Sequence, residues 1–297
     1  MKNKKIVVTG GAGFIGSNLV DALIEKGANV HVIDNFSGGK KENVNKKATL
    51  HVVDIRNLDE ILPIIKNAEY VFHLAALPRV QYSIKYPVET NDVNVNGTLN
   101  VLIASQQERV KRVIYSASSS AYGDQKEMPL RETMVANPKS PYGLQKYIGE
   151  LYCKVWNIVH NLETVSLRYF NVYGNRQNPD GAYALVIGKF LKQKVEGKPM
   201  TICGDGNNTR DFTNVKDVVR ANILVAESNN VGAGEVINIG AGNNYSVNNV
   251  AKLIGGEVEY IEARLEPVNT LADFTLAKKL IGWEPSITLE QGLAELQ

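Results

Sequence analysis

The chain has 297 residues, of which 44% are hydrophobic and 22% are charged, and its formal net charge is +2. These values are ordinary for a globular protein and give no electrostatic reason to expect nucleic acid or an anionic membrane as a partner. No apolar run approaches the length of about 18 residues that a membrane-spanning helix needs, and no targeting segment is visible, so the cytoplasm is the expected location. Cys153 and Cys203 match no metal-binding or redox spacing, and no metal site is predicted.

The first 170 residues alternate short β-branched runs with longer helical patterns. A strand over 6–8 leads into a helix over 14–26, which Gly27 ends. Continuous apolar strands separated by helices indicate an α/β fold with a doubly wound parallel sheet, covered by helices on both faces. The further strands are predicted at 30–33, 50–53, 70–74, 113–115 and 165–167.

Beyond residue 170 the pattern loosens, and 171–183 is predicted to be a loop because it is rich in Asn, Gly and Pro. We expect residues 171–297 to form mainly a smaller, mixed α/β lobe over the ligand edge of the sheet, while a segment at about 205–230 returns to the sheet domain of residues 1–170. The elements expected there are helices over 184–194 and 247–254, a strand over 236–239, and a last helix ending near Ile281.

A glycine-rich loop, TGGAGFIG at 9–16, joins the first strand to its helix. Gly10 or Gly11, together with Gly13 and Gly16, satisfies two registers of a dinucleotide-binding fingerprint. Glycines allow the tight turn and the approach of the backbone to a pyrophosphate, and the helix N-terminus offers free N–H groups to the phosphates. Residues 1–170 are therefore the predicted dinucleotide-binding Rossmann domain.

Asp34 ends the next strand, 18 residues after Gly16. A carboxylate in this position accepts hydrogen bonds from the adenosine ribose and repels a 2′-phosphate. NAD is therefore the predicted cofactor. Lys40 and Lys41 follow soon after and would favour a 2′-phosphate, but we expect them to face solvent.

Tyr142 and Lys146 lie four residues apart in the segment SPYGLQK. On a helix this spacing places both side chains on one face. A free tyrosine has a pKa of about 10, so it is a poor base near neutral pH. A nearby ammonium and the positive ring of oxidised nicotinamide would favour the phenolate. The pair is therefore a candidate for taking a proton from an alcohol while hydride leaves its carbon. A serine-rich segment at 115–123 follows a predicted strand and either hydrogen-bonds the reacting hydroxyl or forms an ordinary polar turn.

Taken together, these segments resemble the extended short-chain dehydrogenases/reductases, and most closely the UDP-sugar 4-epimerases. The likeness covers nearly the whole chain. Its motifs are the segments 9–16, 34–35, 54–55, 73–76, 94–98, 116–123, 168–174, 204–206, 209–212 and 282–285, with the Tyr142/Lys146 pair.

The resemblance implies roles for individual residues. Tyr142, Lys146 and Ser118 are the expected catalytic residues, because the catalytic hydroxyl of the family lies four residues before the tyrosine of a Tyr-Gly pair. The residues expected to contact NAD are Gly10, Gly13, Phe14, Ile15, Gly16, Asp34, Asn35, Asp54, Ile55, Leu74, Ala75, Ala76, Asn94, Ser116, Tyr142, Lys146 and Tyr169. Those expected to face the UDP-sugar are Ser118, Ser119, Ser120, Tyr142, Asn171, Val186, Arg210, Arg264 and Thr270.

The resemblance also implies a reaction in which hydride leaves the sugar C4, a 4-keto intermediate turns in the site, and hydride returns to the other face. The sugar 4,6-dehydratases need acids directly after the catalytic hydroxyl residue, where this chain has Ser119 and Ser120, so dehydration is disfavoured. A UDP-glucuronate 4-epimerase or decarboxylase stays open. The alternatives from other classes are an NAD-binding sensor without turnover and a simple carbonyl reductase.

A residue just before a late Leu-Ala-Asp controls the space for a 2-N-acetyl group in the epimerases, and counting back from Leu271 gives Thr270. A small residue there predicts that both UDP-glucose/UDP-galactose and the N-acetylhexosamine pair are accepted. The preceding sequence, Arg264–Pro267, departs from the common Arg-Pro-Gly-Glu/Asp pattern, so the register of Arg264 is uncertain by about one residue.

In such families, helices corresponding to 88–109 and 141–160 often pair across a two-fold axis, so a homodimer is expected. The second helix carries apolar residues at helical spacing, which would fit such an interface. The preferred alternative is that they pack as core against the sheet. These residues are Leu144, Ile148, Leu151, Val155 and Ile158.

Overall fold

The computed structural model describes residues 1–180, 185–262 and 269–297. Its centre is a seven-stranded sheet in the order β11-β6-β5-β4-β1-β2-β3, and all of its neighbouring pairs are parallel. The order reverses between β1 and β4, which is the switch point where doubly wound sheets bind ligands. The strands are β1 (Lys5–Thr9), β2 (Asn29–Ile33), β3 (Thr49–His51), β4 (Tyr70–His73), β5 (Arg112–Ser118), β6 (Glu163–Tyr169) and β11 (Ala233–Ile239). The predicted doubly wound α/β fold is confirmed.

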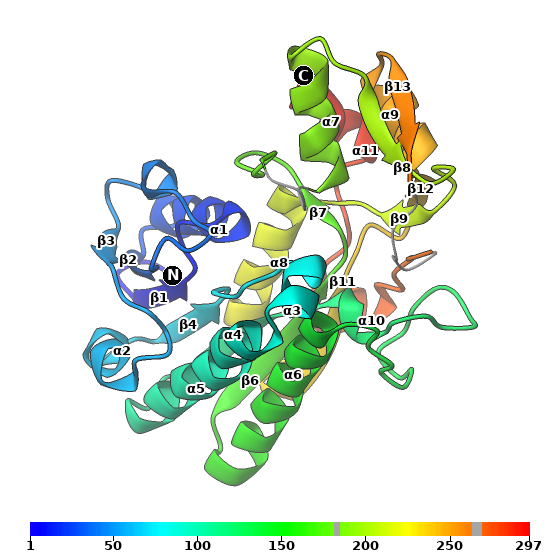
Figure 1. Ribbon diagram of the computed structural model, residues 1–297. Helices are drawn as coiled ribbons and strands as arrows, with labels where there is room; N and C mark the ends of the chain where they lie inside the picture. Colours follow the sequence, from blue (N-terminus) through cyan, green and yellow to red (C-terminus); the bar gives the residue numbers. More distant parts are fainter. Residues whose placement is uncertain (181–184, 263–268) are drawn as a thin grey trace.

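Helices cover both faces of this sheet (Figure 1). On one face, α1 (Phe14–Glu25) and α8 (Val215–Glu227) pack together over a core that includes Leu19 and Val218, with α10 (Thr275–Ile281) beside them. The other face is covered by α2 (Leu58–Ile65), α5 (Gly97–Gln107) and α6 (Pro141–His160). Strand side chains are buried on both faces, which explains their continuous apolar sequences.

The path into α5 begins with α3 (Val80–Lys85) and α4 (Pro87–Asn91) and passes through one π-helical turn, η2 (Asp92–Asn96). Helices with π turns are often found at functional sites, because the wider turn re-aims side chains. The turn holds Asn94, one of the residues expected to contact the cofactor.

A smaller lobe stands over the carboxyl end of the sheet and has its own core around Phe190, Ile202 and Val250 (Figure 1). Its three two-stranded sheets pair β7 (Val172–Tyr173) with β10 (Thr213–Asn214), β8 (Met200–Cys203) with β13 (Val258–Ile261), and β9 (Thr209–Asp211) with β12 (Asn244–Ser246). Its helices are α7 (Val186–Val195), α9 (Val247–Ile254) and α11 (Leu289–Ala294), and the chain crosses between the lobe and the sheet more than once.

The structure corrects three sequence predictions. The strand expected over 50–53 ends at His51, and a further helix, α11, follows the one expected to be last. Capping by Thr288, whose side chain accepts from the Gln291 N–H, starts α11 beyond Pro285. The apolar stripe of α6 does not pack on the sheet: Leu144, Leu151, Val155 and Ile158 are 45–67% exposed. Among the described residues, no helix is long and apolar enough to cross a membrane.

Candidate active site

The loop between β1 and α1 forms a cradle, and at Gly10 and Gly16 the surrounding backbone leaves no space for a side chain. Gly10 has a φ of +72°, and a Cβ there would lie 2.7 Å from the Ala75 nitrogen. A Cβ on Gly16 would collide with the Gly10 carbonyl. Among the described residues no side chain caps the first turn of α1 after Gly13, so its N–H groups remain available to an anion. The cradle therefore fits a pyrophosphate.

Asp34 lies at the end of β2, beside this loop. Its Oδ2 accepts a hydrogen bond from the Ala12 N–H at 2.9 Å and its Oδ1 accepts one from the Phe36 N–H at 2.8 Å. Burial raises the pKa of Asp34, and these two backbone donors lower it. Lys40 and Lys41 are both exposed, as expected. The charged group held beside the glycine loop is therefore the carboxylate of Asp34 and not a lysine side chain.

Asp54 and Asn35 lie together near the outer edge of the sheet, where the Asn35 amide donates to Asp54 Oδ2 at 2.8 Å. Arg56 binds both oxygens of the same carboxylate, at 3.0 and 2.7 Å, and lowers its pKa. The neighbouring Ile55 is buried against Gly97, where a Cβ would collide with its side chain. The expected contacts of these residues with the dinucleotide stay predictions.

His73, at the end of β4, joins the glycine loop to α5. Its Nδ1 lies 2.7 Å from Thr9 Oγ1 and its Nε2 lies 2.9 Å from Thr98 Oγ1, while Thr98 donates to the Asn94 carbonyl. Because the Thr98 hydroxyl proton is used in that bond, Thr98 Oγ1 must accept from His73 Nε2. His73 Nδ1 then accepts from the Thr9 hydroxyl, whose oxygen in turn accepts the Ala75 N–H. Complete burial lowers the pKa of His73 to about 3, which agrees with a neutral ring.

The Asn94 side chain fixes the wall next to this network. It accepts from the Leu77 N–H at 2.8 Å and donates to the Leu77 carbonyl and to Gln145 Oε1. Gln145 lies on α6 between Tyr142 and Lys146, so the amide pair ties the residues after β4 to α6. This wall is the segment Leu74–Ala76, which follows β4, and Asn94 fixes its end through the two hydrogen bonds to the Leu77 backbone.

Tyr142 and Lys146 lie one turn apart at the start of α6, whose N-cap Ser140 accepts from the Gly143 N–H. The Lys146 ammonium donates to the Ser116 carbonyl at 2.8 Å and lies 4.9 Å above the Tyr115 ring. Burial lowers the pKa of Lys146 to about 8. Burial also raises the pKa of Tyr142 above its ordinary value, and a hydrogen bond with the Ser118 hydroxyl lowers it.

The three serines expected near the substrate lie where β5 ends. Ser118 closes β5, and Ser119 and Ser120 continue as a 3-10 turn, η3 (Ser119–Ala121), in which the Ser120 N–H donates to Ser118 Oγ at 3.2 Å. Ser118 lies opposite Tyr169 in the sheet register. Serine, phenol and ammonium groups therefore gather at the carboxyl ends of β5 and β6.

A buried ion pair holds α6 against β6. Glu150, one turn after Lys146, binds Arg168 through both oxygens, at 2.9 and 2.7 Å, and both side chains are almost fully buried. Bidentate geometry of this kind fixes orientation as well as contributing energy. The Arg168 guanidinium also stacks 4.4 Å above the Tyr122 ring.

Arg79 is a functional candidate that sequence analysis missed. It directly precedes α3, and its guanidinium, mostly buried, lowers the pKa of the Tyr142 phenol. The Tyr142 N–H donates at 3.0 Å to Oγ of Ser83, which lies on α3, and this bond keeps α3 against the start of α6. Arg79 is 63 residues before Tyr142, so no sequence spacing links them.

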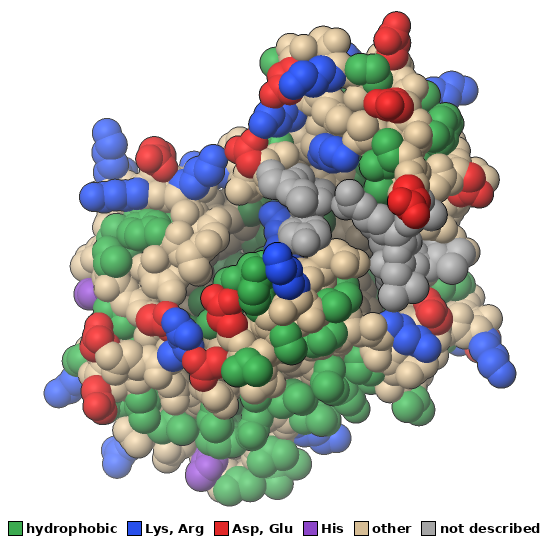
Figure 2. All heavy atoms as spheres, in the orientation of Figure 1, with side chains coloured by type: hydrophobic (Ala, Val, Ile, Leu, Met, Phe, Trp, Pro, Cys, Tyr) green, Lys and Arg blue, Asp and Glu red, His purple; other side chains and the backbone are tan. Residues whose placement is uncertain are grey.

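The residues expected on the substrate side meet where β6 and β9 end. Asn171 Nδ2 donates to Thr270 Oγ1 at 3.2 Å and to the Asp211 carbonyl at 3.3 Å. Arg210 is buried on β9 and donates to the Thr209 carbonyl at 3.0 Å. Figure 2 shows a recess between the sheet domain and the lobe. The structure thus brings together Asn171, Arg210 and Thr270.

The other expected residues differ in how far the structure places them. Val186 begins α7 and is partly exposed, whereas Tyr169 is buried and its hydroxyl donates to Asn222 Oδ1 at 3.0 Å. Arg264 lies outside the described residues. No group of three His, Cys, Asp or Glu side chains suited to a metal occurs among the described residues.

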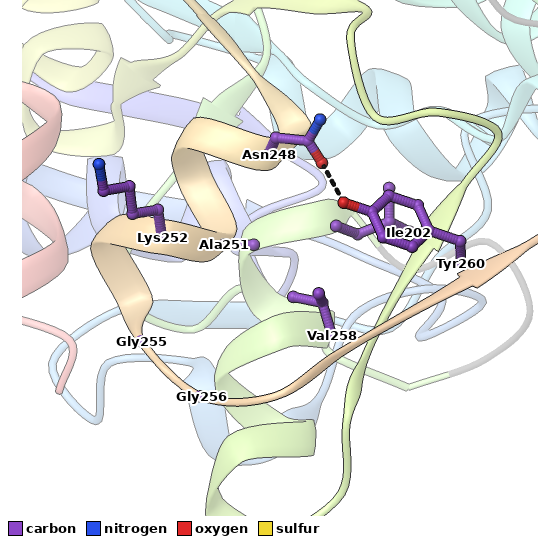
Figure 3. Close-up of a pocket in the computed structure, with 8 residues that line it drawn as sticks. All are labelled: Ile202, Asn248, Ala251, Lys252, Gly255, Gly256, Val258 and Tyr260. Carbon is purple, nitrogen blue, oxygen red and sulfur yellow. Dashed lines mark hydrogen bonds between the residues drawn. The ribbon is translucent and has the colours of Figure 1, made fainter.

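A pocket of about 370 Å³ lies elsewhere, on the outer side of the lobe between α9, β8 and β13 (Figure 3). Ile202, Ala251 and Val258 form its apolar part, and the Tyr260 hydroxyl donates to Asn248 Oδ1 at 3.2 Å. None of the described residues predicted for the site lines it. The candidate site is therefore the polar edge of the sheet and not this pocket.

Comparisons with known proteins agree with this geometry. The UDP-glucose 4-epimerase of Thermotoga maritima, solved with UDP-glucose, is 41% identical, with a TM-score of 0.93 over 97% of this chain and 96% of its own. The UDP-N-acetylglucosamine 4-epimerase of Methanobrevibacter ruminantium, solved with UDP-N-acetylmuramic acid, is 40% identical, with a TM-score of 0.94 over 99% and 97%. The UDP-glucose 4-epimerase of Mycolicibacterium smegmatis is 34% identical over 98% of this chain and 96% of its own.

The model of one protein family matches most of the sheet domain and part of the lobe, residues 6–240. Its description names NAD, the cofactor predicted from the glycine loop and Asp34. The chain belongs to the NAD dependent epimerase/dehydratase family.

Proposed function

We infer that this protein is an NAD-dependent UDP-sugar 4-epimerase that interconverts UDP-glucose and UDP-galactose and also accepts the corresponding N-acetylhexosamines. The observation that carries this proposal is the arrangement of Tyr142, Lys146 and Ser118 at the sheet edge beside an intact glycine cradle. Relatives about 40% identical over almost the entire chain are UDP-glucose and UDP-N-acetylglucosamine 4-epimerases.

The residues that would hold NAD are those of the cradle, Asp34 and the wall after β4. Gly10 to Gly16 and the N-terminus of α1 would bind the pyrophosphate, and Asp34 the adenosine ribose. Lys146 would hold the nicotinamide ribose. When bound, NAD would supply the hydride acceptor and donor for the sugar C4.

Tyr142 takes the proton of the sugar 4-hydroxyl and gives it back. Burial raises the pKa of Tyr142 and so works against the phenolate. Ser118 and the Arg79 guanidinium work against this rise, and a nicotinamide cation would add to their effect. Because Ser118 hydrogen-bonds the phenol, it orients the acceptor and can share the substrate hydroxyl.

The substrate diphosphate would lie against Arg210 and Asn171, with the sugar toward Tyr142. A buried guanidinium suits this task because its planar fork donates to two phosphate oxygens. Thr270 is small enough to leave room for a 2-N-acetyl group, which supports a substrate range that includes the hexosamines. Ser119 and Ser120 supply no general acid, so loss of water from the sugar is not expected.

A second candidate is an acidic UDP-sugar, favoured by one observation. Arg79 is a mostly buried cation beside Tyr142, and a sugar carboxylate would pair with it. The Methanobrevibacter ruminantium relative is bound to UDP-N-acetylmuramic acid, which carries a carboxylate. An Arg79→Met substitution that raised KM for UDP-glucuronate but not for UDP-glucose would favour this candidate.

We also propose a homodimer built on α5 and α6. The exposed stripe of α6, with Ile158 at 67% and Val159 at 62% exposure, is apolar, and hydrophobic side chains gather over these helices in Figure 2. Contiguous apolar patches of this kind mark interaction sites in soluble proteins. Leu151→Asp with Val155→Asp should yield a monomer in sedimentation analysis, and an unchanged mass would rule out this interface.

The experiment that tests the function is a panel of UDP-hexoses, UDP-N-acetylhexosamines and UDP-uronic acids with product identification. Denaturing the purified protein should release NAD. Conversion of UDP-galactose to UDP-glucose without net NADH supports the proposal. Bound NAD with no change in any UDP-sugar would instead favour a sensor, and net NADH release would favour a reductase.

A further inference from the structure

Asp211 fastens three parts of the lobe to one another. Its side chain has no exposed surface, and its Oδ1 accepts the Ala241 N–H at 2.7 Å. Its Oδ2 accepts the Gly242 N–H at 3.0 Å and the Ala272 N–H at 2.9 Å. One carboxylate at the end of β9 thus joins two segments that come 31 and 61 residues later in the chain.

Burial of this carboxylate in its charged form is energetically unfavourable. Burial raises the pKa of Asp211 to about 6, and the groups that oppose this rise are the three N–H donors and the Thr213 hydroxyl. A buried charge destabilises a fold unless it is well hydrogen-bonded, so packing alone does not call for an aspartate here. What the carboxylate provides is two oxygens that hold three N–H groups at fixed positions.

The segments fastened in this way carry residues of the substrate side. Thr270 is two residues before Ala272, and its Oγ1 accepts both the Asp211 N–H and Asn171 Nδ2, each at 3.2 Å. Asn171 also donates to the Asp211 carbonyl. Arg210 is the chain neighbour of Asp211, so the same residue connects Arg210 with the Asn171–Thr270 pair.

We propose that Asp211 is a positioning residue for nucleotide-sugar binding, whose carboxylate fixes Arg210 relative to Asn171 and Thr270. It does not touch the substrate itself and acts through these three residues. The inference rests on the proposed function, which places the UDP-sugar beside them.

Asp217 offers a matched control. It is also buried, and its Oδ2 accepts the Ser286 N–H at 2.9 Å and the Ile287 N–H at 3.0 Å, while Ser286 Oγ donates to its Oδ1 at 2.6 Å. Both aspartates therefore hold backbone N–H groups of a distant segment, and Asp217 differs in that its Oδ1 also pairs with Arg220 at 2.8 Å. Asp217 lies on α8 and fastens the segment Ser286–Ile287 to that helix. It bonds none of the residues assigned to the substrate.

The test compares Asp211→Asn with Asp217→Asn by calorimetric titration with UDP, by kinetics, by bound NAD and by Tm. An amide cannot accept at both ends, so each variant should have a lower Tm. Asp211→Asn should also weaken UDP binding and raise the UDP-sugar KM by about tenfold, with kcat changed less than about threefold and bound NAD unchanged. Asp217→Asn should keep the wild-type UDP affinity.

Equal UDP affinity in Asp211→Asn and wild type would overturn the proposal, as would equal weakening in both variants. UDP titration requires no turnover. Wild-type protein that binds UDP but epimerises no sugar would refute the proposed function while the Asp211 comparison still gave its answer. If Asp211→Asn does not accumulate, Asp211→Glu keeps the charge but moves the carboxylate away from the three N–H groups by one methylene, and unchanged UDP affinity in that variant would also overturn the proposal.

Discussion

The cofactor side and the substrate side of the site are built in different ways. On the cofactor side, Gly10, Asp34 and His73 each lie at or just beyond the end of one parallel strand, and adjacent strands bring them to one edge. On the substrate side, Asn171, Arg210 and Thr270 come from short elements and loops of the lobe, and side-chain hydrogen bonds across 40 to 99 residues of sequence hold them together.

This difference determines how each side can fail. The sheet itself fixes the cofactor side, so a substitution there should change chemistry or local stability while the geometry persists. The substrate side has no such frame, and loss of one hydrogen-bonding group should loosen several binding residues at once.

Tyr142→Phe should have the largest effect, a fall in kcat of about two to four orders of magnitude, because the proton acceptor is lost from an otherwise intact frame. Bound NAD should stay at the wild-type level. Tyr147→Phe, on the same helix, is the matched control and should retain activity in the same assay. Full turnover by Tyr142→Phe would break the comparison, since the chemistry would then lie elsewhere.

His73→Gln tests the network inside the cofactor side. The folded pKa of His73, about 3, is below the value of about 6.5 for an unfolded histidine, so its stabilising contribution is complete above pH 6.5 and is lost as the pH falls toward 3. Between pH 7 and pH 5, wild type should lose about 2 kcal/mol from this group alone. Urea unfolding at both pH values should show a shallower loss in the variant, and equal losses would mean that the ring is not buried neutral.

Thr270→Tyr tests the substrate side. The added ring should lower kcat/KM for the N-acetyl sugars by about tenfold relative to UDP-glucose, because the space for the acetyl group is filled. The substitution also removes the hydroxyl that binds Asn171. Thr270→Ala removes that hydroxyl without adding bulk and should lower both activities alike. If Thr270→Tyr does no more than Thr270→Ala, the residue does not select for sugar size.

Arg79→Met should have the smallest effect. Removing a cation that favours the phenolate raises the pKa of Tyr142, so the acid limb of the kcat/KM profile should move up by about one pH unit or less. Lys85→Met removes an exposed positive charge from the other end of α3 and should leave the limb in place. An unmoved limb in Arg79→Met would show that Lys146 and the cofactor are the only cations that act on the phenol.

Much of the cofactor side could be predicted from the sequence because each of its groups is encoded locally. The glycine loop, Asp34 and the Tyr142/Lys146 pair lie in short segments in which strand, turn and helix signals follow one another. The apolar stripe of α6 shows the limit of such reasoning, because helical spacing cannot tell whether an apolar face meets the sheet or remains exposed. The structure leaves Leu144 and Val155 of α6 exposed.

The sequence by itself determined the α/β class, the position of the glycine cradle and the placement of Tyr142 and Lys146 one turn apart on a helix, because strand and helix periodicity and i, i+4 spacing are local properties. Only the tertiary structure placed Arg79 beside Tyr142 and made Asp211 the junction of three segments, since these contacts join residues 30 to 63 positions apart. Such contacts form only when the whole chain has packed, and no spacing in the sequence records them.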